Sequence, residues 1–379
     1  MKVAIRALLL VFLAAPSFCA PPVSPPDFSA PSVERPASPA VPAPAYSALS
    51  YGSYDLSGLP AYVFTDEESL AAPIIKAIDR ADRTLDVALY NLQIDEAAAA
   101  LVRAKARGVK VRVIFDHAHV FPKAGPQIQA VIDSGIETRA MKGRGSMGTM
   151  HCKFAIFDRS LLETGSANWS GFAQDYSYEN IMFTASRELI GGYQRDFDWL
   201  WGQSRPVSGP GTAAASNTPP PADPTVDLDF NGTLLPDYIF SPRGGTEQAI
   251  VRAIDAARSE ADVAMFTFTS ESIMGALKRA AGRGVHVKLM VFAGQDFPFA
   301  AEARKSRMEL RFKPGRGQDK GQMHNKFAVL DGRLLINGSF NWTNMAENSN
   351  TENTIFTMDP DYVRPYRAEF EKLYGTAKE

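Results

Sequence analysis

Two stretches of the chain, residues 49–205 and 225–379, carry apolar residues in patterns that predict the same order of elements. Each pattern predicts a helix, a buried strand, a second helix that ends at a glycine, and a Val-rich strand. In the first stretch these elements are 67–82, Leu85–Tyr90, a helix ending at Gly108, and Val109–Phe115. In the second they are 246–259, Ala261–Phe266, a helix ending at Gly284, and Val285–Phe292. Strands that alternate with helices predict an α/β fold.

A β-hairpin is predicted further along each stretch. Asp331-Gly332 is a strong turn signal in the second stretch, and Asp158-Arg159 is a weaker one in the first. If residues 151–157 form a strand, His151 and Lys153 share one face while Cys152 points into the core. We predict the same alternation for residues 324–330, with His324 and Lys326 on one face.

The two stretches also repeat each other in sequence. At a separation of 176 residues, Ala77-Ile78-Asp79 matches Ala253-Ile254-Asp255, and Arg107-Gly108-Val109 matches Arg283-Gly284-Val285. At 173 residues, the matches are His151-x-Lys153 with His324-x-Lys326, Asp158 with Asp331, Gly165-Ser166-x-Asn168-Trp169 with Gly338-Ser339-x-Asn341-Trp342, and Glu179-Asn180 with Glu352-Asn353. An internal repeat of this length predicts two similar lobes.

Composition narrows the class of protein. The chain has 379 residues, 45% of them hydrophobic and 22% charged, which is typical of a soluble globular protein of about two domains. These values exclude a disordered chain, a coiled-coil rod and a polytopic membrane protein. The 40 Lys and Arg residues balance 42 Asp and Glu residues, so bulk charge does not predict binding to long nucleic acids. Two cysteines cannot form a disulfide framework.

The ends of the two stretches set the expected domain organisation. Residues 1–20 predict a signal peptide, because Lys2 and Arg6 precede the short apolar run Leu8–Ala15 and a small-residue segment. Residues 21–48 and 206–224 are rich in Pro and Ala and predict an exposed tether and an inter-lobe linker. We therefore expect an exported protein, periplasmic or secreted, with lobe 1 at 49–205 and lobe 2 at 225–379.

The repeated pattern of His-x-Lys, an Asp seven residues after the His, and Gly-Ser-x-Asn resembles the HKD signature of the phospholipase D superfamily. The resemblance covers both lobes. It implies two α/β sandwich lobes, each a mixed sheet flanked by helices, related by a pseudo-twofold axis that brings the two motifs into one site. It also favours His151 as the nucleophile and His324 as the acid and base, although the repeat leaves that order open. Glu179 and Glu352 match the acids that orient the histidines in the family.

The residue types suit attack on a phosphodiester. Such a substrate is anionic, so its hydrolysis needs positive charge, a nucleophile and a proton donor for the leaving alcohol. Lys153 and Lys326 supply the charge, and no metal or other cofactor is required. Four polar residues share the motif face and are predicted to bind substrate: Asn168, Asn341, Ser166 and Ser339. Asp158 and Asp331 have the opposite parity and are predicted to be structural.

Several motif neighbours have simpler interpretations. Cys152, Trp169 and Trp342 are predicted to fill the core. His117 and His119 have no counterparts in lobe 2 and are predicted to lie at the rim of the site.

Three kinds of substrate remain open. A glycerophospholipid, cleaved to phosphatidic acid and a head-group alcohol, fits the signal peptide, the near-neutral charge and the loop Phe297-Pro298-Phe299, which could contact a membrane surface or be buried. DNA or RNA fits a run of basic residues that leads to His324, with a thinner version in lobe 1: Arg304, Lys305, Arg307, Arg311, Lys313, Arg316 and Lys320, and Arg139, Lys142 and Arg144. Cardiolipin-synthase-like phosphatidyl transfer comes third because no membrane helix is predicted. No obligate protein partner is indicated.

Overall fold

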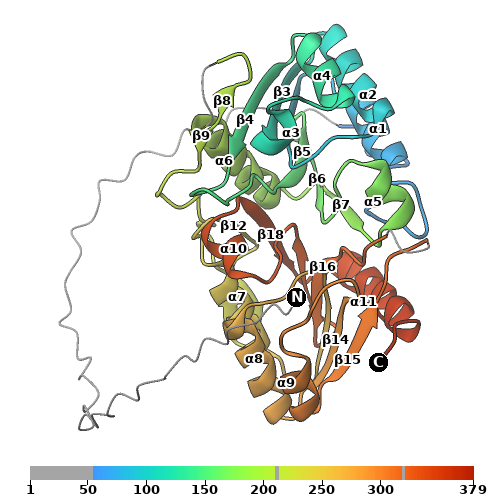
Figure 1. Ribbon diagram of the computed structural model, residues 1–379, viewed down its shortest axis with the longest axis vertical. Helices are drawn as coiled ribbons and strands as arrows, with labels where there is room; N and C mark the ends of the chain where they lie inside the picture. The colour runs from blue at the N-terminus through green and yellow to red at the C-terminus, as the bar shows by residue number, and fades with distance from the viewer. Residues whose placement is uncertain (1–53, 210–212, 318–320) are drawn as a thin grey trace, which may run out of the picture. The chain divides into compact units, whose positions relative to one another are not determined.

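The computed structural model describes residues 54–379, apart from 210–212 and 318–320. The predicted signal peptide and tether, and Lys320 of the basic run, lie outside the described residues. The described chain contains a nine-stranded sheet in lobe 1, a seven-stranded sheet in lobe 2 and a separate two-stranded sheet (Figure 1). None of the described helices is long and apolar enough to cross a membrane.

Lobe 1 and the segment after it contain nine strands and six helices. The strands are β1 (Tyr62–Phe64), β2 (Thr84–Leu89), β3 (Lys110–Asp116), β4 (Glu137–Lys142), β5 (Lys153–Phe157), β6 (Leu161–Gly165), β7 (Asn180–Thr184), β8 (Arg205–Pro206) and β9 (Ala213–Ala214). The helices are α1 (Ala71–Arg80), α2 (Asp95–Ala106), α3 (His117–Val120), α4 (Pro126–Asp133), α5 (Gly171–Tyr176) and α6 (Arg187–Gln203).

Lobe 2 repeats this order after a short β10–β11 hairpin. Its strands are β10 (Leu228–Phe230), β11 (Thr233–Leu235), β12 (Tyr238–Ser241), β13 (Glu260–Met265), β14 (His286–Phe292), β15 (Glu309–Lys313), β16 (Lys326–Leu330), β17 (Leu334–Gly338) and β18 (Glu352–Thr357). Its helices are α7 (Thr246–Ala256), α8 (Glu271–Gly282), α9 (Ala300–Lys305), α10 (Asn344–Asn348) and α11 (Pro360–Gly375).

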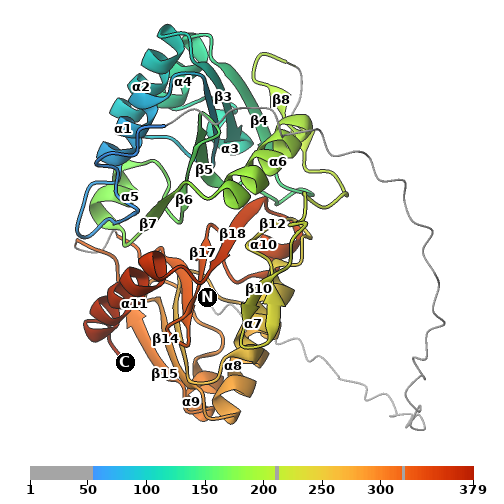
Figure 2. The ribbon, with the colours of Figure 1, turned by 180° about the vertical axis from the view of Figure 1, so that it is seen from behind.

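The two large sheets share one topology. The strand order β1-β7-β6-β5-β2-β3-β4 in lobe 1 corresponds to β12-β18-β17-β16-β13-β14-β15 in lobe 2. In both, three neighbouring strands run parallel, β2-β3-β4 and β13-β14-β15. In lobe 1 β9 also pairs with β4 in parallel, and the other neighbours pair antiparallel, so the sheets are mixed. Helices α1, α2 and α4 cover one face of the first sheet and α6 the other, while α7, α8 and α9 lie opposite α11 in lobe 2 (Figures 1 and 2). The predicted α/β sandwiches are confirmed.

The apolar patterns place most of the predicted helices and strands within a few residues of their observed bounds. Ile74 and Ile78 of α1, and Ile250 and Ile254 of α7, are fully buried because helical spacing puts them on one face. The glycines predicted to end the second helices, Gly108 and Gly284, have φ values of 94° and 93°, which a side chain would disfavour. The sequence does not predict α6 and α11, although each packs on one face of its sheet (Figures 1 and 2).

Both predicted hairpins form, and each turn begins at the motif aspartate. Asp158 and Arg159 have φ values of 51° and 54°, and Asp331 and Gly332 have 52° and 60°. The Asp158 carboxylate accepts backbone N–H bonds from residues 82, 83 and 84, and Asp331 accepts equivalent bonds from residues 258, 259 and 260. These contacts tie each hairpin to the strand beside it, as the predicted structural role requires.

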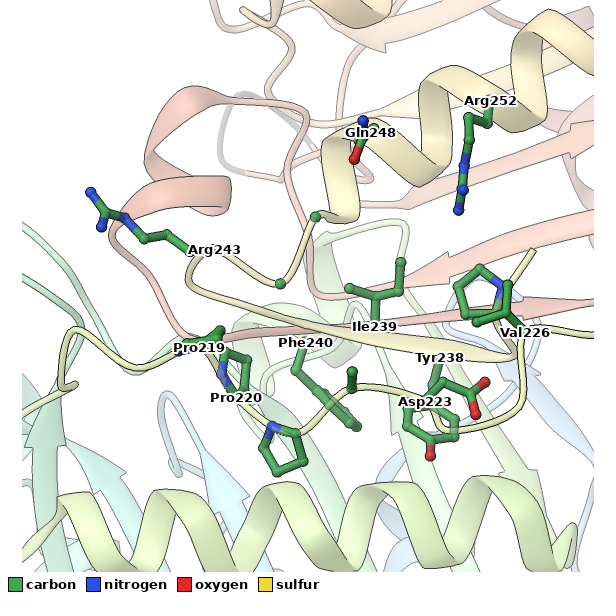
Figure 3. Close-up of a pocket in the computed structure, with 15 residues that line it drawn as sticks. Pro219, Pro220, Asp223, Val226, Tyr238, Ile239, Phe240, Arg243, Gln248 and Arg252 are labelled. Atoms are coloured by element: carbon green, nitrogen blue, oxygen red, sulfur yellow. The ribbon is translucent and has the colours of Figure 1, made fainter. Parts of the chain in front are cut away.

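The described residues of the segment predicted as a linker contact both lobes. Strands β8 and β9 both pair with β4, and Ala215 packs into the apolar cluster beneath α6. Further along, Pro219 and Asp223 form one wall of a pocket of about 270 Å³, with β12 and the first turns of α7 opposite (Figure 3). None of the predicted site residues lines this pocket.

Candidate active site

The two motif histidines are held in place by the opposite lobe. The His151 N–H donates to the carbonyl of Thr351 (2.9 Å), and the His324 N–H donates to the carbonyl of Tyr178 (3.0 Å). The strands therefore begin at Lys153 and Lys326, two residues later than predicted, because each histidine peptide bonds across the lobes and not to its own sheet.

The loops that precede the histidines make this crossing at close range. A Cβ atom at Gly148 would lie 2.5 Å from the carbonyl oxygen of Ser349, and one at Gly321 would lie 1.7 Å from that of Tyr176. Any larger residue would push the loop away from the other lobe. Glycine at these two positions therefore allows each histidine to reach the shared site.

Each imidazole is bound by a carboxylate of the other lobe. His151 Nδ1 lies 2.8 Å from Glu352 Oε2, and His324 Nδ1 lies 2.7 Å from Glu179 Oε1. Both carboxylates are buried, with 2% of Glu179 and 1% of Glu352 exposed. With Nδ1 occupied, Nε2 of each ring has no hydrogen bond to any of the described residues. The arrangement fixes which ring nitrogen is available for chemistry.

The motif serines orient these carboxylates. Ser166 Oγ donates to Glu179 Oε2, and Ser339 Oγ donates to Glu352 Oε2, both at 2.6 Å. Both serines are fully buried, and each also accepts a backbone N–H from β7 or β18. The sequence predicts that Ser166 and Ser339 bind substrate, and the structure corrects this. Their hydroxyls form hydrogen bonds inside the protein and hold the glutamates in place.

The two motif lysines are almost completely buried beside the histidines. Lys153 Nζ donates to the carbonyl of His151 (2.7 Å), and Lys326 Nζ donates to that of His324 (2.6 Å). Burial lowers the pKa of Lys153 to about 8 and that of Lys326 to about 7, and the nearby glutamates moderate both shifts. An anionic ligand in this site would stabilise both ammonium groups.

The same burial favours the neutral form of both imidazoles. It lowers the pKa of His151, opposed by the charge of Glu352, and it lowers the pKa of His324 further, assisted by the charges of Lys326 and Lys153. A neutral imidazole has a lone pair on Nε2 and can attack or accept a proton.

Asn168 and Asn341 lie at equivalent positions after β6 and β17. Both are half-buried, and neither amide oxygen has a partner among the described residues. Next to them, Trp169 and Trp342 are buried in the cores of their lobes, as is Cys152 beside His151. The prediction that these last three residues pack in the core is confirmed.

Comparison with known proteins identifies the family of the chain. The chain matches the family described as cardiolipin synthase, PLD-like domain, over residues 74–201 and 250–374. The chain belongs to the phospholipase D superfamily.

Two relatives within this superfamily match one lobe's length of the chain. This chain is 36% identical over 128 residues to human mitochondrial cardiolipin hydrolase, and the alignment covers 33% of this chain and 49% of the relative. It is 30% identical over 156 residues to phospholipase D of Rickettsia bellii (strain RML369-C), covering 40% and 75%. The chain thus spans about half the length of the human relative.

A solved structure covers both lobes. Phosphatidylserine synthase of Haemophilus influenzae Rd KW20 aligns with a TM-score of 0.61 at 14% identity, covering 83% of this chain and 86% of that one. At this identity the likeness concerns the fold alone. The alignment includes both lobes of the repeat.

Three residues of the predicted basic run are engaged within this phospholipase D fold. Arg316 donates to the carbonyls of Ser177 and Gln174 in lobe 1, and Arg311 donates to the carbonyl of Tyr374. Lys313 is buried, with 5% exposed. These three residues therefore join elements, whereas Arg304, Lys305 and Arg307 of the same run are exposed. In lobe 1, Arg139 similarly donates to the carbonyl of Trp201, and Arg144 to Asn217.

The aromatic loop of lobe 2 packs inward. Phe299 is buried, and Phe297 lies against Phe268 with 5.6 Å between ring centroids. Of the two interpretations left open for this loop, the buried one holds.

Two asparagines, Asn180 and Asn353, are not predicted as site residues, although they match each other in the repeat. Asn353 Nδ2 crosses to Thr164 Oγ1 of lobe 1 (2.8 Å), and Asn180 Nδ2 crosses to Asn325 Oδ1 of lobe 2 (2.8 Å). Each follows one of the site glutamates. The signal was their repetition as Glu-Asn in both lobes of this phospholipase D fold.

Proposed function

We propose that the protein is an exported phosphodiesterase that hydrolyses a glycerophospholipid to phosphatidic acid and a head-group alcohol. The observation that carries the proposal is the pair of imidazoles, His151 and His324, each held at Nδ1 by a carboxylate of the other lobe. Each imidazole also has a lysine ammonium group beside it.

The reaction proceeds by two displacements at phosphorus. In the first, Nε2 of one histidine forms a bond to phosphorus while the bond from phosphorus to the alcohol oxygen breaks. The other histidine, protonated on both nitrogens, gives its Nε2 proton to that oxygen. In the second, the same histidine takes a proton from water as the water oxygen bonds to phosphorus. The bond to the first imidazole then breaks, and the enzyme returns to its starting state.

The remaining polar residues stabilise the transferring phosphoryl group. Lys153 and Lys326 donate to its nonbridging oxygens, and Asn168 and Asn341 add neutral hydrogen bonds. Each such preorganised donor contributes a factor of about 10²–10³ to the rate. With this much charge stabilisation from side chains, the reaction requires no metal ion.

A lipid substrate is supported by two kinds of observation. The relatives include a cardiolipin hydrolase and a phospholipase D. Several basic residues that would favour nucleic acid are bonded within the protein, Arg316 and Lys313 among them. Export rests on the sequence of residues 1–20.

The test compares His151→Ala, His324→Ala and a matched control, His286→Ala, which removes an exposed histidine paired with Glu309. Vesicles of phosphatidylcholine, phosphatidylethanolamine or cardiolipin, and single-stranded DNA, are each offered in EDTA. We expect the wild type and His286→Ala to release head-group alcohol, and the two site variants to lose about 10³-fold or more in kcat. Circular dichroism and thermal melting show that the variants fold.

Three results would contradict the proposal in different ways. Appreciable turnover by either site variant would remove the paired-histidine mechanism. Loss of wild-type activity in EDTA would remove the metal-free mechanism. Cleavage of DNA with intact lipid would assign the site to nucleic acid.

A further inference from the structure

An aromatic ring backs each histidine–lysine pair. Tyr90 follows β2 and Phe266 follows β13 at the equivalent place, and their N–H groups donate to the carbonyls of Cys152 and Asn325, both at 2.9 Å. The ring centroids lie 4.9 Å from His151 and 4.4 Å from His324, in both cases tilted by 65°. The two half-sites therefore share this packing of an aromatic ring on the motif histidine.

They differ in one hydroxyl group and in what surrounds it. Tyr90 has a hydroxyl where Phe266 has none. In lobe 2, the ring behind Phe266 is Phe292, at 5.3 Å. In lobe 1, the residue at that position is Asp116, whose buried carboxylate accepts the N–H groups of Ala118 and Met150. One half-site has a polar wall and the other an aromatic wall.

The Tyr90 hydroxyl is available to a ligand. It has no hydrogen-bond partner among the described residues, although Tyr90 is half-buried and a tyrosine hydroxyl in such a place usually finds one. Burial and the charges of Asp116 and Glu352 raise its pKa, so it remains a protonated donor. The ring contacts His151, and its centroid lies 5.2 Å from Lys153 Nζ.

His119 fixes the position of this ring. Its imidazole meets Tyr90 edge to face, with 4.6 Å between centroids and 88° between planes. His119 Nε2 is buried and has no hydrogen-bond partner in the described part of the chain. The equivalent residue of lobe 2 by the repeat is Gln295, which instead accepts a hydrogen bond from Thr267. Among the described residues, the rings that contact Phe266 are Phe292 and His324, and neither lies at the place of His119 in the repeat.

We propose that Tyr90 is a specificity-determining residue whose hydroxyl hydrogen-bonds to a hydroxylated ester group of the substrate, and that His119 is its positioning residue. The aromatic wall of lobe 2, formed by Phe266 and Phe292, faces the less polar ester group. This inference rests on the proposed phosphodiesterase function. It makes the two ends of the diester unequal in a site that is otherwise built as a repeat.

Two soluble diesters test the inference without depending on the natural substrate. Dihexanoyl phosphatidylglycerol and dihexanoyl phosphatidylpropanol have the same charge and the same phosphatidyl group, and their leaving head groups, 2,3-dihydroxypropyl and propyl, differ only in two hydroxyls. We expect the wild type to favour the dihydroxypropyl ester. Tyr90→Phe, which copies the ring of lobe 2, should reduce the ratio of kcat/KM values for the two esters by about 2- to 10-fold, through KM for the dihydroxypropyl ester.

Two further variants separate the hydroxyl from the ring packing. Phe266→Tyr in the Tyr90→Phe background should not restore the ratio, because the returned hydroxyl lies on the wrong wall. His119→Ala should lower the ratio, and His119→Phe should restore it by preserving the ring contact.

Each other outcome is decisive. Equal losses on both esters would mean that Tyr90 acts through His151, and an unchanged ratio would mean that its hydroxyl does not meet the substrate, and either would overturn the inference. If His119→Phe failed to restore the ratio, the positioning role would fall. A folded wild-type protein that cleaves neither ester would instead overturn the proposed function, and this inference with it.

Discussion

At the scale of single residues, the site depends on carboxylates that act from across the lobe boundary. A histidine whose Nδ1–H is held by a carboxylate presents Nε2 in one tautomer and one orientation. Here Glu352 holds His151 and Glu179 holds His324. The spacing of 28 residues between each motif histidine and its own lobe's glutamate indicates the acids but not this exchange.

The exchange predicts which histidine responds to which glutamate. Glu352→Gln should shift the imidazole NMR signals of His151 and leave those of His324, and Glu179→Gln should do the reverse. Each should lower kcat by about 10²-fold or more, since the neutral amide no longer stabilises an imidazolium. The chain contains only five histidines, so the signals can be assigned by substitution. A shift confined to the histidine of the same lobe would refute the crossed pairing.

The motif serines allow a sharper test of positioning against substrate binding. Ser166→Ala leaves a buried oxygen of Glu179 without its donor, so we expect kcat to fall by roughly 10-fold while KM stays constant. Ser204→Ala is the matched control, because Ser204 is equally buried and bonds to a carbonyl at the end of α6. Steady-state kinetics on a soluble diester separates the two roles. A rise in KM without loss of kcat would return Ser166 to the substrate.

At the scale of elements, the hairpin turns anchor the site strands. Asp331 sits at the first turn position and accepts the N–H groups of residues 258–260. Burial alone would raise its pKa, but these backbone hydrogen bonds outweigh burial, and the pKa lies below the usual 3.8. The carboxylate therefore stabilises the folded protein only while it is ionised.

Replacing this carboxylate should lower stability in a pH-dependent way. We expect Asp331→Asn to reduce the free energy of unfolding by about 1–2 kcal/mol at pH 7. The pKa of Asp331 is lower in the folded protein than in the unfolded chain. The stabilisation is therefore lost as the pH falls through the folded-state pKa. The difference in free energy of unfolding between wild type and variant should shrink below pH 3.8. Urea unfolding at pH 7 and below pH 3.8 measures this difference. Asp296→Asn, at an exposed position, is the control. A difference that grows in acid would contradict the assignment.

The elements also show which parts of the fold a local sequence pattern predicts. Helix α1, the strands β2 and β3 and both hairpin turns follow from patterns within a few residues. The loops before His151 and His324 do not, because the partners that shape them, Thr351 and Tyr178, lie in the other lobe. The same holds for Ser166, whose parity on a strand indicates a face but not that a buried glutamate occupies it. Interactions across the repeat were beyond any local pattern.

At the scale of the whole molecule, the two lobes of the repeat form one site because each lobe contributes a glutamate to the other lobe's histidine. Each lobe supplies the histidine, lysine and asparagine of its own half and the carboxylate of the other half. The exchange extends to the backbone, through parallel bridges between Met150 and Thr351 and between Tyr178 and Met323. Neither half-site is complete within its own lobe, which links the orientation of both imidazoles to the packing of the two lobes.

This arrangement predicts that two inactive chains cannot rescue each other. His151→Ala and His324→Ala each lack one imidazole of a site that is assembled within a single chain, so an equimolar mixture should remain as inactive as either variant alone. Activity on a soluble diester is measured after mixing the native proteins and again after unfolding and refolding them together. Wild-type protein diluted with either variant is the control, and its activity should fall only in proportion to dilution. Recovery toward a quarter or more of wild-type activity after co-refolding would show that the histidines meet between chains, because lobes exchanged between two variants restore one intact site in such a pair.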